Sequence, residues 1–310
     1  MHSETGTERV DQTPANIELQ PIEALKSTRG RAARRRLLRE SLQNVLDRAT
    51  ALEAEGEHGV HQLRVALRRA RTAASIVRRA DDDGMAEELA IALRWASQEL
   101  GPVRDLDTLL RESLVSDTAE SPAGLDALRA RALENRSRAF AAAEASVRAR
   151  GWEEQLERAI ARLDDGDADG HASRELSAGA ARAELQRRWK KLKKRARHAN
   201  GGGVEALHAL RIQAKKHRFT IELFADAFPD AKHKRDRMLA ALKRLLDRLG
   251  ALNDIATHRS LLAGFAADAD GVGSYAAGFL AGRESACTET LIVKAEKTLR
   301  KLIEVKPFWK

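Results

Sequence analysis

The sequence is poor in cysteine and aromatic residues and has no long apolar segment. The only cysteine among its 310 residues is Cys287, so neither an intramolecular disulfide nor a multi-cysteine zinc cluster can form. Phe, Trp and Tyr make up only 4% of the chain, which argues against aromatic platforms that stack nucleic-acid bases. No run of about 20 apolar residues is present, so we expect no membrane-spanning helix and no membrane partner.

The first 20 residues are polar and lack the apolar centre of a secretory signal. We interpret residues 1–20 as a flexible leader and expect a cytoplasmic protein. Charged residues are abundant, with 55 Lys and Arg against 46 Asp and Glu, a formal net charge of +9. This excess of positive charge favours an acidic partner, such as nucleic acid, an anionic membrane or a phosphate polymer.

Strand-like alternation is nearly absent, and the chain is rich in Ala, Leu, Arg and Glu with only six prolines. This composition predicts an all-α protein. We expect its helices to be separated at Gly56, residues 81–84, Gly101–Pro102, an acidic linker at 164–173, residues 201–203, Pro229, Gly250 and Gly271–Gly273.

A twelve-residue segment occurs twice, at residues 60–71 and 207–218, about 147 positions apart. If both segments are helical, offsets of 0, 3, 7 and 10 residues fall within one narrow arc. Each row would then be roughly 15 Å long, a length that suits an extended polyanion better than a small anion. The predicted rows are His61, Arg64, Arg68 and Arg71 in the first segment, and His208, Arg211, Lys215 and Arg218 in the second.

A cationic row is more often just the solvated face of an amphipathic helix. Here Leu63 and Leu67 form an apolar stripe directly beside the first row, so the cations flank the face that is expected to be buried. Repetition with histidine in register is also harder to explain by solubility alone. We therefore favour a functional interpretation of both rows.

A second repeated element supports an internal duplication. Residues 100–105 read L-G-P-V-R-D and residues 249–254 read L-G-A-L-N-D, in the same order relative to the first repeat. We expect two homologous halves, 21–163 and 174–310, with each glycine as a left-handed helix end. Asp105 and Asp254 would then lie near the start of the next helix, either as caps or as groups that orient an arginine of the rows.

These residues resemble the CHAD family, the conserved-histidine α-helical domain. The similarity lies in the paired V/L-H-x-L-R-V/I-x-x-R/K-R/K-x-R segments and the two L-G-x-x-x-D elements. It implies two pseudo-twofold-related four-helix bundles around a basic central cavity or groove, and binding of inorganic polyphosphate by the eight residues of the two rows. Two positions depart from a strict repeat, because His217 stands where the first half has Ala70 and Asn253 replaces Arg104. The resemblance also leads us to expect localisation at polyphosphate granules, with granule-associated proteins as further partners.

The family often includes a triphosphate-tunnel (CYTH) domain with an E-x-E-x-K strand. The nearest sequence here, from Glu53 to Glu57, lacks the lysine, so we expect no such domain. A second tier of candidate cations comes from projecting the apolar stripes of two other helices, although solvation explains these residues at least as well. The members of this tier are Arg31, Arg34 and Arg35 before the first motif, and Arg188, Lys191 and Arg195 before the second.

Arg provides forked donors and Lys a compact charge, and both suit phosphate oxygens. A bound phosphate would favour protonated His61 and His208, so we expect binding to tighten as the pH falls through the histidine range. We expect no enzyme activity, metal or cofactor, because the acidic clusters fall in predicted turns and no Walker-type loop is present. The alternatives are a nucleic-acid-binding protein that uses the same basic surface and, less favoured, a polyphosphate-processing phosphatase.

Overall fold

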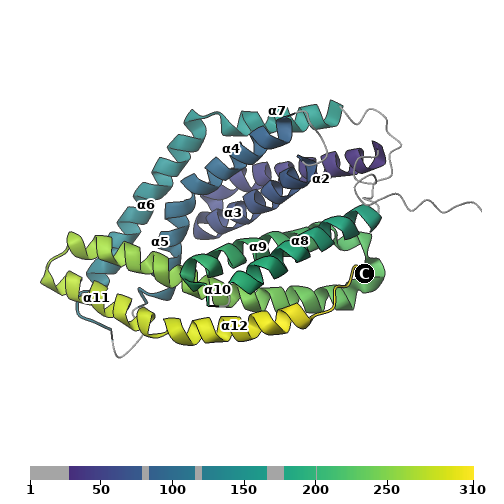
Figure 1. Ribbon diagram of the computed structural model, residues 1–310. Helices are drawn as coiled ribbons and strands as arrows, with labels where there is room; N and C mark the ends of the chain where they lie inside the picture. Colours follow the sequence, from purple (N-terminus) through teal and green to yellow (C-terminus); the bar gives the residue numbers. More distant parts are fainter. Residues whose placement is uncertain (1–27, 79–83, 116–120, 166–177, 200) are drawn as a thin grey trace, which may run out of the picture.

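The protein is described by a computed structural model that covers residues 28–78, 84–115, 121–165, 178–199 and 201–310 (Figure 1). All regular secondary structure in these ranges is helical, which confirms the predicted all-α class. None of the helices described is long and apolar enough to cross a membrane. The helices are α2 (Thr28–Thr50), α3 (Leu52–Val77), α4 (Met85–Glu99), α5 (Gly101–Glu112), α6 (Leu125–Ala149), α7 (Trp152–Asp165), α8 (Ala178–Ala199), α9 (Gly203–Leu223), α10 (Lys232–Ala267), α11 (Gly271–Ala286) and α12 (Thr288–Glu304), with 3₁₀ turns at Ala225–Ala227 and Pro229–Ala231.

Two helical groups pack side by side, one from each half of the chain (Figure 1). In the first, α2, α3, α4 and α7 enclose a core that includes Leu38, Leu67 and Trp152. In the second, α8, α9, α10 and α12 enclose a core that includes Leu185 and Leu210. Burial of one apolar stripe per helix provides the main driving force for each group. This helix order is consistent with the predicted pair of bundles, whose pseudo-twofold relation stays a prediction.

A third core joins the two halves. It is built from α5 and α6 of the first half and from α10 and α11 of the second, with Leu109, Leu128, Leu262 and Leu280 at its centre. Helices α6 and α11, with the C-terminal part of α10, form the extension on the left of Figure 1. The two halves are therefore fixed to each other by a shared apolar interior, which holds the two motif helices at a defined distance.

Three expected helix boundaries were wrong, and in two of them a helix continues through a glycine. Helix α3 runs past Gly56 and helix α10 past Gly250, because a glycine inside a helix costs only about 1 kcal/mol and neighbouring leucines keep the helix packed. Neither Gly101 nor Gly250 has a positive φ, so neither is the expected left-handed helix end. Asp254 consequently lies in the middle of α10 and is not a cap.

The third difference concerns the predicted acidic linker at 164–173. Helix α7 includes Asp164 and Asp165, so the helix extends into the segment that was assigned to the linker. Asp164 forms an ion pair with Arg39 of α2, which ties the end of α7 to the first bundle. Residues 166–173, the leader at 1–20 and Pro21 lie outside the described residues.

Gly250 gives a test of this helix assignment. A Cβ at position 250 would meet no atom within 4 Å, whereas one at Gly124, whose φ is +89°, would lie 2.8 Å from the carbonyl oxygen of Val272. We therefore expect Gly250→Ala to raise the free energy of unfolding by about 0.5–1 kcal/mol. We expect Gly124→Ala to lower it. Urea unfolding followed by circular dichroism measures both, and destabilisation by Gly250→Ala would contradict a continuous α10.

Candidate anion-binding site

The two motif helices pack against each other where the two halves meet. The guanidinium of Arg68 on α3 lies over the ring of Phe219 on α9, 5.7 Å from its centroid. Arg64 and Arg68 of α3 and Arg211 and Lys215 of α9 are close enough to influence one another's charge, as the direction of their pKa shifts shows. We call these four residues the central cluster. It brings four of the eight predicted row residues together.

The central cluster lies at the edge of the packed interior. On α3, Leu63 and Leu67 are buried, and on α9 Leu210 and Ala214 are buried. The cations that neighbour them in sequence are only partly exposed to solvent. The cations therefore flank the buried face, as the sequence pattern predicts, and do not stand on an outer solvated face.

Burial and repulsion destabilise the charged forms of the central cluster. Burial, followed by the charges of Arg68 and Arg211, lowers the pKa of Lys215 from 10.5 to about 6. Burial, followed by Arg64 and Arg211, lowers the pKa of Arg68 to about 10, and every charge that contributes to this shift is another cation. Burial is also the largest cause of the lowered pKa of Arg64 and of Arg211. The cluster thus has an unbalanced positive charge that an anion would relieve.

Two aspartates, one from each half, lie close enough to the central cluster to stabilise its charged forms. Asp254 on α10 and Asp105 on α5 both favour the charged form of Arg211, and Asp105 does the same for Arg64. Burial raises the pKa of Asp105, and Asp254 adds to this effect, so the two carboxylates are themselves neighbours. This position favours the interpretation in which the aspartates orient the arginines of the rows.

The two pseudo-equivalent arginines differ in their hydrogen bonds. Arg64 donates through Nη1 to the carbonyl oxygen of Ser97 at 2.8 Å, which fixes it to the end of α4. The Nε of Arg211 is buried and has no hydrogen-bond partner. Arg211 consequently retains an unused donor at the centre of the site, in a place where a phosphate oxygen would satisfy it.

Comparison with known proteins agrees with this geometry. Residues 36–263 match the family model of the CHAD domain, which is well over half of the chain. The chain belongs to the CHAD family. The predicted resemblance is therefore confirmed.

The crystal structure of the CHAD domain from the plant Ricinus communis is similar in fold to this CHAD domain, with a TM-score of 0.71 and 22% sequence identity. The alignment covers 87% of this chain and 91% of that one. At this identity, the similarity shows the fold alone. No curated protein sequence matches the chain. The E-x-E segment at 53–57 is helical here, whereas a CYTH motif would require a strand.

The two motif histidines of this CHAD domain lie on exposed positions of their helices. The Nδ1 of His208 is 3.1 Å from the Oδ1 of Asn253, the second-half counterpart of Arg104. Burial, followed by Arg104 and Arg68, lowers the pKa of His61. The repeat therefore places each motif histidine beside the same position of the second element, which is a cation in one half and an amide in the other.

The last cation of each row differs between the halves. The pKa of Arg71 is lowered by burial and then by Arg94 of α4, so Arg71 lies beside another cation. Arg218 donates through Nε to Glu222 at 2.9 Å, and Arg69 of α3 contacts the same carboxylate at 3.3 Å. The charge of Arg71 is therefore repelled by that of Arg94, whereas the charge of Arg218 is balanced by Glu222.

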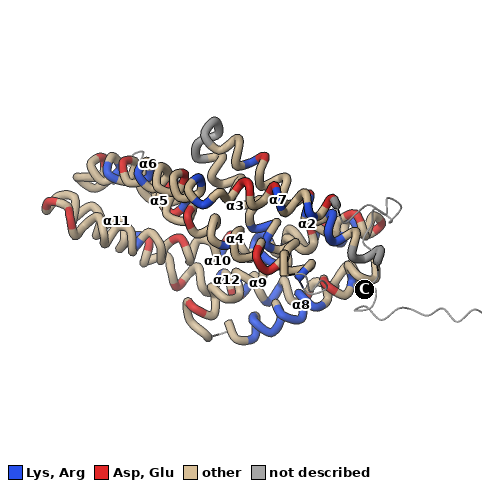
Figure 2. Tube along the Cα trace, turned by 90° about the horizontal axis from the view of Figure 1, so that it is seen from above, with Lys and Arg blue, Asp and Glu red and all other residues tan. Residues whose placement is uncertain are grey.

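The second-tier candidates lie in varied surroundings. Arg188 is buried and bonded to Glu184 and to Ser75, and burial is the largest cause of its lowered pKa. Lys191 and Arg195 are exposed on α8, a helix along which Figure 2 shows many basic residues. The remaining three come from α2: Arg34 is fully buried, Arg35 is half-buried with an unpartnered Nε, and the side chain of Arg31 lies outside the described part.

His217, where the first repeat has Ala70, is a core residue of this CHAD domain. Its ring lies 5.5 Å from that of Trp189 and 5.4 Å from that of Trp309, between centroids. Burial lowers the pKa of His217 to about 3, so it stays neutral at physiological pH. The exchange of alanine for histidine therefore changes the packing of the second core and leaves the central cluster unaltered.

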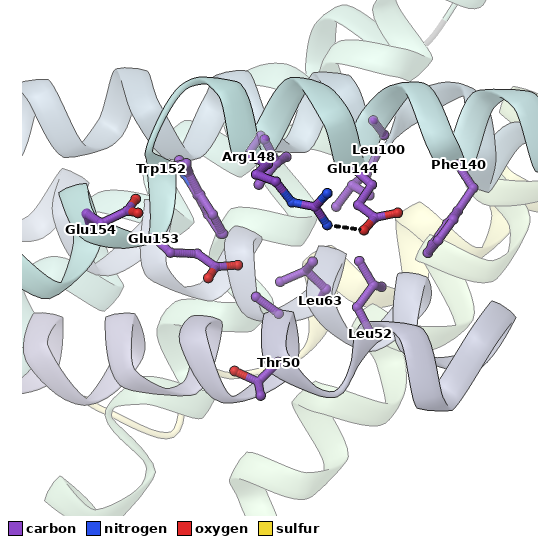
Figure 3. A pocket seen from close by; sticks show the side chains of 14 residues that line it. Thr50, Leu52, Leu63, Leu100, Phe140, Glu144, Arg148, Trp152, Glu153 and Glu154 are labelled. Carbon is purple, nitrogen blue, oxygen red and sulfur yellow. Dashed lines mark hydrogen bonds and ion pairs between the residues drawn. The ribbon is translucent and has the colours of Figure 1, made fainter.

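A pocket of about 360 Å³ is lined by residues of α2, α3, α4, α6 and α7 (Figure 3). Leu63, Leu100 and Phe140 line it, and the charged pair inside it is Arg148 with Glu144, 2.6 Å apart. Glu153 and Glu154 add two further carboxylates to its wall. With three carboxylates and one arginine in its wall, the pocket carries net negative charge and is unsuited to a polyanion.

Sequence reasoning missed three residues next to the site: Arg94, Lys216 and Glu222. Burial and four cations, namely Arg188, Arg71, Lys191 and Arg94 in order of effect, lower the pKa of Lys216. Lys216 could have been found, because it aligns with Arg69 when the two motifs are superposed. No comparable sequence signal marks Arg94, whose role depends on how α4 packs against α3.

Proposed function

We propose that this CHAD domain binds inorganic polyphosphate at the central cluster and does not convert it chemically. The observation that supports this most directly is the partly buried group of four cations supplied equally by α3 and α9. Internal phosphates of polyphosphate each carry about one negative charge and offer only acceptor oxygens. Such a chain can accept hydrogen bonds from both helices and relieve the repulsion among these side chains.

Nucleic acid fits the same surface less well. Phe219, the aromatic residue beside Arg68, is buried and offers no exposed face on which a base could stack. The exposed aromatic residues Tyr275 and Phe279 belong to α11, which packs against α6 and α10 and lies away from the central cluster. A linear phosphate chain without bases requires no such platform.

Competition separates the candidate functions. With a labelled long-chain polyphosphate as probe, we expect unlabelled polyphosphate to displace it at a phosphate concentration at least about tenfold lower than DNA or RNA requires, and we expect the affinity to fall steeply with salt. Equal displacement by DNA would favour nucleic acid as the partner. Release of inorganic phosphate by the purified protein with Mg²⁺ would instead indicate the phosphatase alternative.

Binding of this kind would retain the protein on polyphosphate granules, where other granule-associated proteins are its expected partners. The test is a fluorescent fusion in cells that accumulate polyphosphate. We expect the wild-type fusion to follow the granules, and an Arg68→Gln/Lys215→Gln fusion to remain diffuse.

A further inference from the structure

The two ends of the motif-helix pair are chemically different, although the repeat makes them equivalent. Positions 69, 71 and 75 of α3 correspond to positions 216, 218 and 222 of α9 by the same offset that aligns the two motifs. We call the end that carries Arg71, Lys216 and Ser75 the first end. The end that carries Arg218, Arg69 and Glu222 is the second end, where Glu222 occupies the position equivalent to Ser75.

The second end is closed by Glu222. Its Oε1 accepts from Arg218 Nε at 2.9 Å, and its Oε2 lies 3.3 Å from Arg69 Nη2. One carboxylate thus holds the last cation of the second row and a cation of the other motif helix. Both arginines would have to give up this partner before they could bind a phosphate, which offsets much of the gain.

The first end stays open and strongly basic. Ser75 is uncharged, and its hydroxyl accepts a hydrogen bond from Arg188 of α8 at 2.7 Å. Burial and then the four cations named above, from α3, α4 and α8, lower the pKa of Lys216. Glu184 of α8 forms ion pairs with Arg187 and Arg188. We call Arg71, Arg94 and Lys216 the open-end cluster.

We propose that a bound polyphosphate leaves the central cluster on one side only, over the open-end cluster, because Glu222 neutralises the equivalent exit. This inference rests on the proposed function and adds a direction to it. It assigns Arg94 and Lys216 as binding residues, removes Arg218 from direct binding in the wild-type protein, and gives Ser75 and Glu222 the role of setting which end is used.

The matched pair Arg71→Gln and Arg218→Gln tests this asymmetry, because the two positions are equivalent in the repeat. We expect Arg71→Gln to weaken binding of long-chain polyphosphate about tenfold or more, the typical loss for one charged hydrogen bond. Arg218→Gln should change it by about twofold or less, since its charge is already balanced. Isothermal titration calorimetry at fixed salt gives both values, with circular dichroism as the check on folding.

Reciprocal exchanges at the two controlling positions make the test independent of the loss of any one arginine. Glu222→Ser should tighten binding, and in that background Arg218→Gln should become about as damaging as Arg71→Gln. Ser75→Glu should weaken binding by closing the first end. Glu289→Ser, which removes an exposed carboxylate of α12, controls for the change in net charge and should leave the affinity nearly unchanged.

The outcomes separate the two proposals. If the wild-type protein fails to bind polyphosphate, the proposed function is wrong. If it binds, but Arg71→Gln and Arg218→Gln cause equal losses and Glu222→Ser does not make Arg218 more important, then the chain uses both ends and the one-sided path is wrong.

Discussion

Replacing Arg68 and Lys215 together with glutamine should weaken binding of long-chain polyphosphate by about two to four orders of magnitude. Charged hydrogen bonds contribute about 1.5–3 kcal/mol each, and the loss of two corresponds to this range. This pair is preferred to a double variant of Arg64 and Arg211. Arg64 also donates a hydrogen bond to the carbonyl oxygen of Ser97, so its removal would disturb α4. Glutamine retains a similar length and polarity, so the change is mainly one of charge.

The same double variant should be more stable than the wild type when no ligand is present. Burial and mutual repulsion lower the pKa of both Arg68 and Lys215, so the free protein carries a charge arrangement that opposes folding. Repulsion among cations in a binding site is relieved either by a bound anion or by removal of the cations. Mutation of such a site therefore lowers the affinity and raises the stability of the free protein. Loss of affinity together with loss of stability would instead indicate damage to the fold.

A control that replaces the same number of basic side chains uses Lys294→Gln and Lys297→Gln. Both residues are exposed on α12, which packs against α10 and α11. We expect this control to bind polyphosphate within about threefold of the wild type, because exposed distant charges are screened by salt. If the two double variants lose affinity equally, binding depends on net charge alone, and the central cluster is not the site.

The helical class and the position of the cation rows could be predicted from the sequence because both follow from local periodicity. Leu63 and Leu67 mark the buried stripe, and Arg64 and Arg68 are fixed beside it by helical geometry. Gly250 shows where local signals fail, since its effect on the helix is smaller than the effect of the leucines that pack around it. The helix boundary was therefore wrong, while the helix face was right.

Other parts of the site depend on contacts between distant segments and leave no local trace. Burial and then Arg68 from the opposite half lower the pKa of Lys215, and the second ion pair of Glu222 is with Arg69 of α3. The two motifs look alike as sequences, so they predict equal roles for Arg71 and Arg218. The packing of α3 against α4 places Arg71 beside Arg94. The pair of Arg218 with Glu222 is an i,i+4 contact within α9, which the sequence could have indicated.

The binding of polyphosphate should also depend strongly on pH through Lys215. With a pKa of about 6, this amine is mostly neutral in the free protein at pH 8, whereas a bound polyanion favours the ammonium form. Binding at pH 8 must then take up about one proton. The affinity should rise as the pH falls from 8 towards 6, by up to about tenfold per pH unit, and should level off once Lys215 is protonated before binding.

His61 is also mostly neutral in the free protein at pH 8, and a bound polyanion favours its protonated form as well. Burial, Arg104 and Arg68 lower the pKa of His61, so its contribution comes at lower pH than that of a free histidine. The proton taken up at pH 8 is therefore assigned to Lys215 or to His61 by comparing the wild type with Lys215→Arg. Titration calorimetry in two buffers with different ionisation enthalpies measures this proton directly.

Lys215→Arg is the matched variant, because arginine keeps the positive charge and stays protonated throughout this range. We expect it to bind polyphosphate at pH 8 at least as tightly as the wild type, with the proton uptake reduced by about one. Long chains should be used, since terminal phosphates also titrate near neutral pH and contribute less in long polymers. Unchanged proton uptake in Lys215→Arg would contradict this prediction. It would show that Lys215 is already charged in the free protein, and that burial and the neighbouring cations do not lower its pKa to about 6.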